Sequence, residues 1–481
     1  MSALPTRRQF LQATSLLPVG LLAGGSLAQD TRRPLPIPPL LDARASKGVV
    51  ELVAQSGQTE FWPGRPSATA GYNGAYLGPT VRLHAGDDVR FQVTNRLAEE
   101  TTVHWHGLLV PALVDGGPHN TIAPGATWRP TVPVRQAAAT NWYHAHPHMN
   151  TARQVYSGLA GMLVVTDRQE QALGLPSRYG VDDLPLVLQD KAFDGERRLV
   201  YPTGHMHAMH GVHGNVLLVN GVPGPTASVP AGLVRLRLLN AGNARLLDIA
   251  FEDGRTFHWI ASEGGLLREP VPLQRLSLAS GQRAEVLVDF SQGGAASLVN
   301  VLPQRPQAPR RTQPLMHFAV EGSGRATAVP AKLAQWEGQR ASPSLRRRRM
   351  VLNSGMGGMG GGMGMGMAGM GMHSIDGRPF DMRRIDQRVR LGDVEIWEVT
   401  AQGMVMPHPF HMHGVHFEVL SRGGQSPVVE DRGRRDTVIV DETVELLVHF
   451  TQPAPEQAPF MYHCHILEHE DMGMMGQFTV A

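Results

Sequence analysis

The only cysteine of this 481-residue chain, Cys464, lies between two histidines near the C-terminus. If this segment begins on a β-strand, successive side chains point to opposite faces of the sheet. His463 and His465 then face one way and Cys464 the other, so the three side chains cannot easily bind the same metal ion. The segment therefore predicts two adjacent metal centres that are joined by three consecutive residues.

The residues that follow Cys464 indicate that the metal centre at this cysteine binds copper. Two imidazoles, one thiolate and a weak axial thioether are the ligands of a type 1 ("blue") copper site. Cys464, His469 and Met474 supply three of these four groups. The second imidazole must come from elsewhere in the chain, and so must the partners of His463 and His465.

Three further histidine motifs can supply the missing ligands. Each contains a His-x-His pair, which on a strand places both imidazoles on one face. The motifs are His104-Trp105-His106, His144-Ala145-His146 and His408-Pro409-Phe410-His411-Met412-His413. With His463 and His465 there are four such pairs, and their eight imidazoles can hold three copper ions with positions left open for a small oxygen species. His408 is then left to complete the type 1 site.

The rest of the chain is typical of an all-β protein. Gly (54) and Pro (36) are abundant, long helical periodicities are scarce, and short alternating runs are separated by turn signals, which indicates β-sandwiches. We expect three blocks, at residues 45–168, 180–322 and 346–481, and an Asn-Gly or Asp-Gly pair at 73, 220 and 376 suggests that they are copies of one fold. The expected strands include Thr80–His84, Asp88–Val93, Leu184–Leu188, Val216–Val219, Leu233–Leu239, Ala284–Asp289, Val394–Val399, Phe417–Leu420, Thr437–Val440, Val444–Phe450 and Gly476–Val480.

The N-terminus predicts export. Thr6-Arg7-Arg8-Gln9-Phe10-Leu11 precedes an apolar run that ends in small residues, so residues 1–28 resemble a twin-arginine signal peptide. No other segment approaches the ~20 apolar residues that span a bilayer, and a net charge of +2 gives no reason to expect nucleic-acid binding. We expect a periplasmic protein without a membrane span in its mature form. Metal binding would protect its lone thiol from oxidation there.

All four ligand motifs, in their order along the chain, resemble those of three-domain multicopper oxidases of the laccase and copper-efflux type. The closing run HCHILEHEDMGMM is especially similar to that of bacterial cuprous oxidases. The resemblance covers the whole mature chain and implies three tandem cupredoxin-like Greek-key β-sandwich domains, of which the middle one is structural. It also implies four copper ions: a type 1 ion bound by His408, Cys464, His469 and Met474, a type 2 ion bound by His104 and His411, and a binuclear type 3 pair bound by His106, His144, His146, His413, His463 and His465.

The resemblance further implies an activity. Such enzymes take electrons singly from a donor and reduce O2 to water, and Asp115 and Glu470 match two carboxylates that assist proton delivery in the family. The alternative for both is an ordinary surface or turn carboxylate. We expect a monomer that oxidises Cu(I) in copper tolerance and, less specifically, small phenols or aromatic amines. The alternatives are a general laccase with organic donors and a copper-sequestering protein without turnover.

Methionines bear on the choice of donor, because soft thioethers favour Cu(I). Residues 356–372 hold seven Met, nine Gly and one Ala, where cuprous oxidases carry a methionine-rich insertion. A labile Cu(I) site is therefore expected among Met356, Met359, Met363, Met404 and Met406, unless the tract is only a low-complexity loop.

One position departs from the relatives, which have an aspartate four residues before the type 1 histidine, where this chain has Met404. A substrate site here is either entirely sulfur-based or does not form as it does in them. The segment 205–213, with four histidines, is either another copper-loading site or a set of surface histidines.

Overall fold

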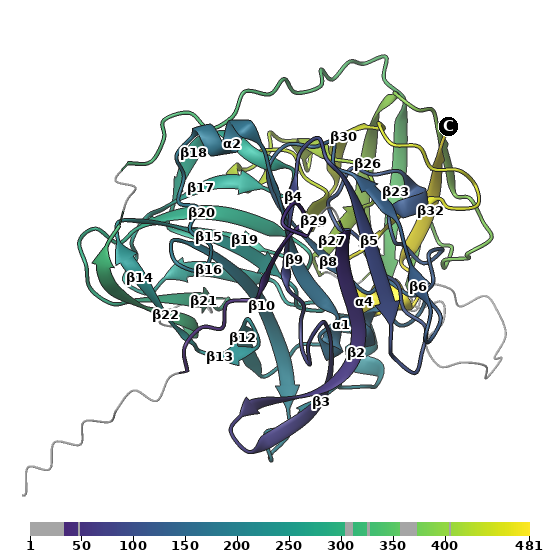
Figure 1. Cartoon of the computed structure of the whole chain (residues 1–481). Helices are drawn as coiled ribbons and strands as arrows, with labels where there is room; N and C mark the ends of the chain where they lie inside the picture. Colours follow the sequence, from purple (N-terminus) through teal and green to yellow (C-terminus); the bar gives the residue numbers. More distant parts are fainter. Residues whose placement is uncertain (1–32, 47–48, 304–310, 325–327, 356–372, 404–405) are drawn as a thin grey trace, which may run out of the picture. The chain divides into compact units, whose positions relative to one another are not determined.

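The computed structural model describes residues 33–46, 49–303, 311–324, 328–355, 373–403 and 406–481 (Figure 1). The predicted signal peptide, the methionine tract 356–372 and Met404 lie outside the described residues. No helix in the described ranges is long and apolar enough to cross a membrane.

The chain forms three consecutive pairs of β-sheets. In the first pair, one sheet has the order β1 (Leu40–Asp42), β4 (Thr80–His84), β9 (Ala160–Thr166), β8 (Ala139–His144), and the other has the order β3 (Arg65–Tyr72), β2 (Val49–Trp62), β5 (Asp88–Asn95), β6 (Thr127–Trp128), with β7 (Thr131–Pro133) beside β5. Buried and more exposed side chains alternate along β5, so that Val89, Phe91 and Val93 pack with β4 and β9 in one core.

The second pair begins at Asp183. One sheet has the order β13 (Val222–Pro223), β12 (Val216–Val219), β10 (Asp183–Phe193), β15 (Leu233–Asn240), β20 (Arg283–Asp289), β17 (Phe257–Ser262), β18 (Gly265–Leu273), with β11 (Leu199–Val200) beside β10. The other has the order β14 (Thr226–Ala231), β22 (Thr312–Ser323), β21 (Ala296–Val301), β16 (Leu247–Phe251), β19 (Arg275–Leu278). Nearly every residue of β10 is buried, as expected of a strand that is covered on both faces.

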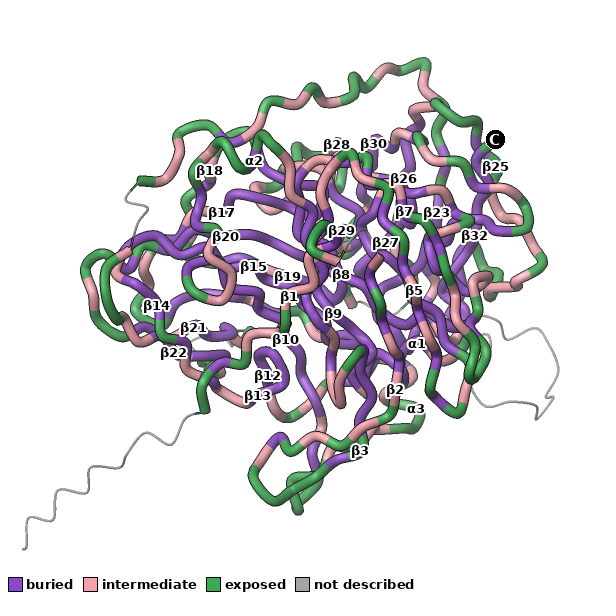
Figure 2. The backbone as a smooth tube through the Cα atoms, viewed as in Figure 1, coloured by how far each residue is buried: buried purple, intermediate pink, exposed green. Residues whose placement is uncertain are grey.

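The third pair holds the C-terminal motifs. One sheet has the order β24 (His373–Ile375), β23 (Arg347–Ser354), β26 (Val394–Gly403), β30 (Val444–His449), β28 (Phe417–Arg422), and the other has the order β25 (Gln387–Val389), β32 (Met475–Val480), β31 (Phe460–Cys464), β27 (His408–Met412), β29 (Thr437–Val440). The helices are short: α1 (Thr151–Ser157), α2 (Arg168–Ala172), α3 (His205–His210), α4 (Leu467–Asp471), and the 3-10 turns η1 (Ala112–Val114) and η2 (Val429–Asp431). The all-β prediction is confirmed, and Figure 2 shows buried residues running along the central strands.

The repeated Asn/Asp-Gly pairs have the same role in all three blocks. Asn73, Asn220 and Asp376 each have a positive φ, of 58°, 49° and 53°. Their side-chain oxygens accept the backbone N–H of Val53, Val187 and Val351 at 2.6–2.8 Å. Asn and Asp tolerate this left-handed conformation better than other non-glycine residues. The shared turn confirms the internal repetition that the sequence suggested.

Buried charges join the first sandwich to the second. Glu285 on β20 pairs with Arg235 and Arg237 of β15 and accepts the hydroxyl of Thr140 on β8 at 2.6 Å. Both arginines and Glu285 are almost completely buried. Burial would raise the pKa of Glu285, but the two positive charges outweigh it and lower the pKa to about 2.

Replacing Glu285 with alanine is expected to lower the free energy of unfolding by about 3–5 kcal/mol, because two buried guanidinium groups lose a partner. The native pKa lies below the ordinary 4.5, so the carboxylate stabilises the fold above about pH 4.5 and less as the pH falls towards 2. Urea unfolding should therefore give a difference from wild type that shrinks in acid. Glu196→Ala removes an exposed partner of Arg198 and should cost less than about 1 kcal/mol. Equal losses in the two variants would contradict this prediction.

Candidate copper centres

Backbone pairing aligns histidines within the third sandwich and within the first. On β31, His463 lies opposite His411 of β27, and Cys464 lies opposite Phe410. In the first sandwich His104 and His144 form an antiparallel bridge, with the His104 N–H donated to the carbonyl of His144 at 2.9 Å. The expectation that both histidines of a pair lie on a strand is wrong. His144, His411 and His463 lie on β8, β27 and β31, but His146, His413 and His465 follow the ends of these strands, and His104 and His106 lie outside the strands.

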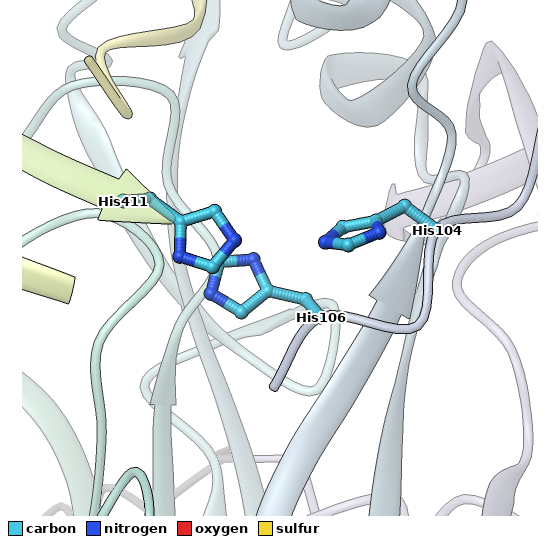
Figure 3. Close-up of side chains that lie close together, drawn as sticks. All are labelled: His104, His106 and His411. Atoms are coloured by element: carbon cyan, nitrogen blue, oxygen red, sulfur yellow. The ribbon is translucent and has the colours of Figure 1, made fainter. Parts of the chain in front are cut away.

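Eight histidines converge in three buried groups. In each group, nitrogen atoms of three imidazoles lie within 4.8 Å of one another. The groups are His104, His106 and His411; His106, His144 and His465; and His146, His413 and His463. Figure 3 shows the first group, in which His411 from β27 meets two histidines of the first sandwich. The predicted ligands of the type 2 and type 3 coppers therefore lie together.

The ring nitrogens of these groups fit a metal. Six buried nitrogens of these rings have no hydrogen-bond partner among the described residues. One is Nδ1 of His146, which lies 3.3 Å from the Glu470 carboxylate. The other five are Nε2 of His104, His144, His411 and His465, and Nδ1 of His106. In these five rings the opposite nitrogen contacts an oxygen. The oxygens include the Asp115 carbonyl at 3.1 Å from His104, the Asp436 carbonyl at 2.8 Å from His411 and the Ser280 hydroxyl at 3.1 Å from His465. Metal-binding histidines are oriented in this way, with one nitrogen held by oxygen and the other free for the ion.

Burial also keeps these imidazoles neutral. It lowers the pKa of His411 to about 4, and it lowers the pKa of His106, His144, His413 and His465 well below the ordinary value. A metal ion binds the neutral form of histidine. The unpartnered nitrogens therefore present lone pairs to the space between them.

The two predicted proton carriers both touch the outer nitrogens of these histidines. Asp115 Oδ2 lies 2.8 Å from Nδ1 of His413 and 3.2 Å from Nδ1 of His104. Glu470 lies 3.1 Å from Nδ1 of His463 and 3.3 Å from Nδ1 of His146. Asp115 therefore contacts the Nδ1 atoms of His104 and His413, not their Nε2 atoms. These two Nδ1 contacts are also close enough for Asp115 to form a metal site with the same two histidines. Burial would raise the pKa of Glu470, but the two imidazoles outweigh it and lower the pKa to about 2.

The predicted type 1 ligands form a separate buried group. Cys464 Sγ lies 3.5 Å from Nδ1 of His408 and 3.8 Å from Nδ1 of His469. The chain leaves β31 at Cys464 and turns into α4, which brings His469 back over the sulfur. Met474 is fully buried in the same core, and its carbonyl accepts the Cys464 N–H at 3.1 Å. Burial raises the pKa of the Cys464 thiol, so only a bound cation would keep it as a thiolate.

Several contacts were not predicted from the sequence. Ser280 and Arg283 belong to the middle sandwich, yet Ser280 touches His465, and Arg283 binds both oxygens of Asp436 at 2.6 and 2.8 Å. Asp436 in turn lies 3.2 Å from Nε2 of His106. These residues are far apart in the sequence, and no motif connects them.

The type 1 group is covered by residues that the ligand motifs did not indicate. His373 stacks on His469 with ring centroids 3.9 Å apart, and Ser354 Oγ lies 3.3 Å from Nε2 of His408. The other ring nitrogen of His469 donates to the carbonyl of Met209 in α3 at 3.1 Å. The first six residues of the four-histidine segment 205–213 thus form α3, which lies beside the type 1 ligands. Met406 is half-buried against the third core, and Met356, Met359, Met363 and Met404 lie outside the described residues.

Comparison with known proteins identifies this architecture. Models of the multicopper oxidase family match residues 54–170 and 361–481. The solved structure of a bacterial laccase-like multi-copper oxidase, CueO, from Ochrobactrum sp. is 42% identical and aligns over 93% of this chain and 100% of its own, with a TM-score of 0.84. This likeness confirms three tandem cupredoxin-like Greek-key β-sandwiches.

Two further relatives differ in what their names describe. A multicopper oxidase from Campylobacter jejuni, described as a metallo-oxidase, is 29% identical over 93% of this chain and 95% of its own, with a TM-score of 0.81. A protein from Rahnella sp. (strain Y9602) named cell division protein FtsP is 40% identical over 99% of this chain and 98% of its own length. Similarity in sequence therefore extends to proteins named for quite different roles.

Proposed function

Because this chain belongs to the multicopper oxidase family, we propose that it oxidises Cu(I) and reduces dioxygen to water. Four Cu(I) ions lose one electron each, and one O2 accepts these four electrons and four protons to give two waters. The observation that carries the proposal is the set of six buried imidazole nitrogens without a hydrogen-bond partner among the described residues, in clusters that also contain both sequence neighbours of Cys464. Buried polar atoms are rarely left unpaired, and a bound metal ion would account for all six nitrogens at once.

Different residues of the chain would bind the copper ions and deliver the protons. Bound copper would supply one-electron storage at four positions, with His408, Cys464, His469 and Met474 holding one ion and the eight clustered histidines holding three. The segment His463-Cys464-His465 places ligands of both centres on consecutive residues. Asp115 and Glu470 orient the histidines that they touch, and we assign to them the delivery of protons.

The surroundings of the type 1 ligands support a metal ion as donor. His408 and His469 are completely buried, and both of their outer nitrogens contact protein atoms, Ser354 Oγ and the Met209 carbonyl. Among the described residues, neither ring offers an edge that a phenol could touch. Phenols and aromatic amines are therefore assigned a slower side reaction. The Campylobacter relative, named a metallo-oxidase, agrees with this assignment.

A second candidate is a role in cell division without turnover, which is favoured by full-length similarity to proteins named FtsP. The complete ligand set favours the oxidase. We also propose that the protein is a periplasmic monomer, exported through residues 1–28.

Steady-state oxygen consumption tests the donor. With Cu(I) as the donor, uptake is expected to exceed that with a small phenol such as 2,6-dimethoxyphenol by about tenfold or more in kcat/KM, a difference of ~1.4 kcal/mol. The assay is run with and without excess Cu(II), because a phenol can also act indirectly through added copper. Copper-loaded protein that consumes no oxygen with either donor would favour the second candidate. Faster turnover of the phenol in the absence of added copper would favour a general laccase.

A further inference from the structure

We propose that Met206, His207 and His210 on α3 form a Cu(I)-binding site, and that electrons reach the type 1 centre from it. The inference rests on the proposed oxidase function and names the place where its substrate binds. This site belongs to the middle sandwich and uses none of the residues of the methionine tract.

The three side chains lie on one face of α3. Residues three and four positions apart are neighbours on a helix, which places both Met206 and His207 next to His210. At 3.6 residues per turn the three positions span only about 100° of the helix circumference. One thioether and two imidazoles are soft and intermediate ligands that suit cuprous copper. His205 lies outside this span, on the other side of Met206.

This face is open to solvent. Met206 is 63% exposed, the highest value among the large apolar side chains of the described residues, and His207 and His210 are half-buried. Met209, in contrast, is 8% exposed and anchors the helix against the protein. Because so exposed a methionine buries little apolar surface, its thioether is available to bind a metal ion together with the two histidines.

The buried side of the same helix touches the type 1 centre. A helix leaves its last carbonyls without internal partners. Here the carbonyl of Ala208 accepts the Nε2–H of His373 at 3.0 Å, and the carbonyl of Met209 accepts the Nε2–H of His469 at 3.1 Å. The Nδ1 atom of His469 faces Cys464, so this imidazole connects α3 to the sulfur.

The connection is short. From the ring of His210 it follows the side chain to the backbone nitrogen, the peptide bond to Met209 and the Met209 carbonyl, and it then crosses one hydrogen bond to His469. Each bound Cu(I) would give up one electron along this path and leave as Cu(II), while dioxygen is the final acceptor. His373 stacks on His469 and donates a hydrogen bond to the Ala208 carbonyl, and so it holds α3 in this position.

Cu(I) binding tests the site without turnover. Copper-loaded protein is first reduced under anaerobic conditions, so that its resident copper accepts no further electrons, and is then titrated with Cu(I) against a colorimetric Cu(I) chelator. The triple variant Met206→Ala/His207→Ala/His210→Ala is expected to bind one Cu(I) fewer than wild type. Alanine is the best helix former, so α3 and its carbonyl contacts are retained. Unchanged blue absorption verifies that the type 1 centre is intact.

Kinetics provide the second readout. In the triple variant the KM for Cu(I) should rise at least tenfold, while kcat with a phenol stays as in wild type. His205→Ala is the matched control and should bind and turn over Cu(I) normally. Equal Cu(I) stoichiometry and KM in wild type and the triple variant would overturn the α3 site, and a loss of binding in His205→Ala would overturn the assignment to this face. If wild type itself consumes no oxygen with Cu(I), the proposed function fails instead.

Discussion

Replacing Cys464 with serine is expected to abolish the blue absorption of the copper-loaded protein and to reduce oxygen consumption to background. The thiolate is the defining ligand of a type 1 site, and a serine hydroxyl cannot replace it. Changing merely an outer partner of a metal ligand typically costs ~10–100-fold in activity or affinity, so loss of the ligand itself should cost at least ~100-fold. Visible spectroscopy, copper analysis and an oxygen electrode measure the three quantities.

The control for this variant is Met474→Leu, which keeps the thiolate and both imidazoles. It should retain the blue colour, because the axial thioether binds weakly and mainly tunes the redox potential. Cys464 also lies in the core of the third sandwich, so a thermal unfolding scan of both variants checks that the fold survives. A blue Cys464→Ser protein would disprove the assignment of this centre.

Replacing Glu470 with glutamine is expected to lower kcat by about 100-fold, the lower part of the range for a group that transfers protons. The amide has nearly the same shape but carries no charge and takes up no proton at neutral pH. It would leave His146 and His463 with a poorer partner. Blue absorption and copper content should be unchanged, since Cys464 and the histidines remain. A changed solvent isotope effect on kcat would separate a proton role from a structural one.

Glu468 offers a matched control on the same short helix. It is also a buried carboxylate, but it accepts hydrogen bonds from Asn243, Tyr201 and the N–H of Val212, and touches none of the clustered histidines. Glu468→Gln should therefore keep most of the turnover. Similar losses in the two variants would indicate that α4 is merely sensitive to loss of charge, and the proton role of Glu470 would be rejected.

Much of this site could be predicted because its ligands are paired within short segments. An alternating run such as Thr80–His84 determines its own strand. The His-x-His motifs identify the ligands by residue type and spacing, even though at most one histidine of each pair lies on a strand. The outer contacts could not be predicted in the same way. Ser280, Arg283 and Asp436 meet only after different sandwiches dock, and neither charge nor hydropathy near them indicates a partner.

The contacts of α3 and His373 with the type 1 ligands could not be predicted from the sequence for a different reason. The histidines of 205–213 suggested metal binding through their side chains, but the contacts that position α3 come from its backbone carbonyls. A carbonyl leaves no trace in the sequence. His373 gave no signal either, because a single histidine at the start of β24 is indistinguishable from an ordinary core residue.

Two contacts of the middle sandwich, Ser280 with His465 and Arg283 with Asp436, bear on the order in which the chain folds. The histidine clusters contain residues from 104 to 465 and are braced by the middle sandwich, so no part of the nascent chain can assemble them alone. Contacts this distant form late in folding, after the loops between them have closed. Metal ions could therefore bind the eight clustered histidines only after the sandwiches have docked, whereas the ligands around Cys464 all belong to the third sandwich.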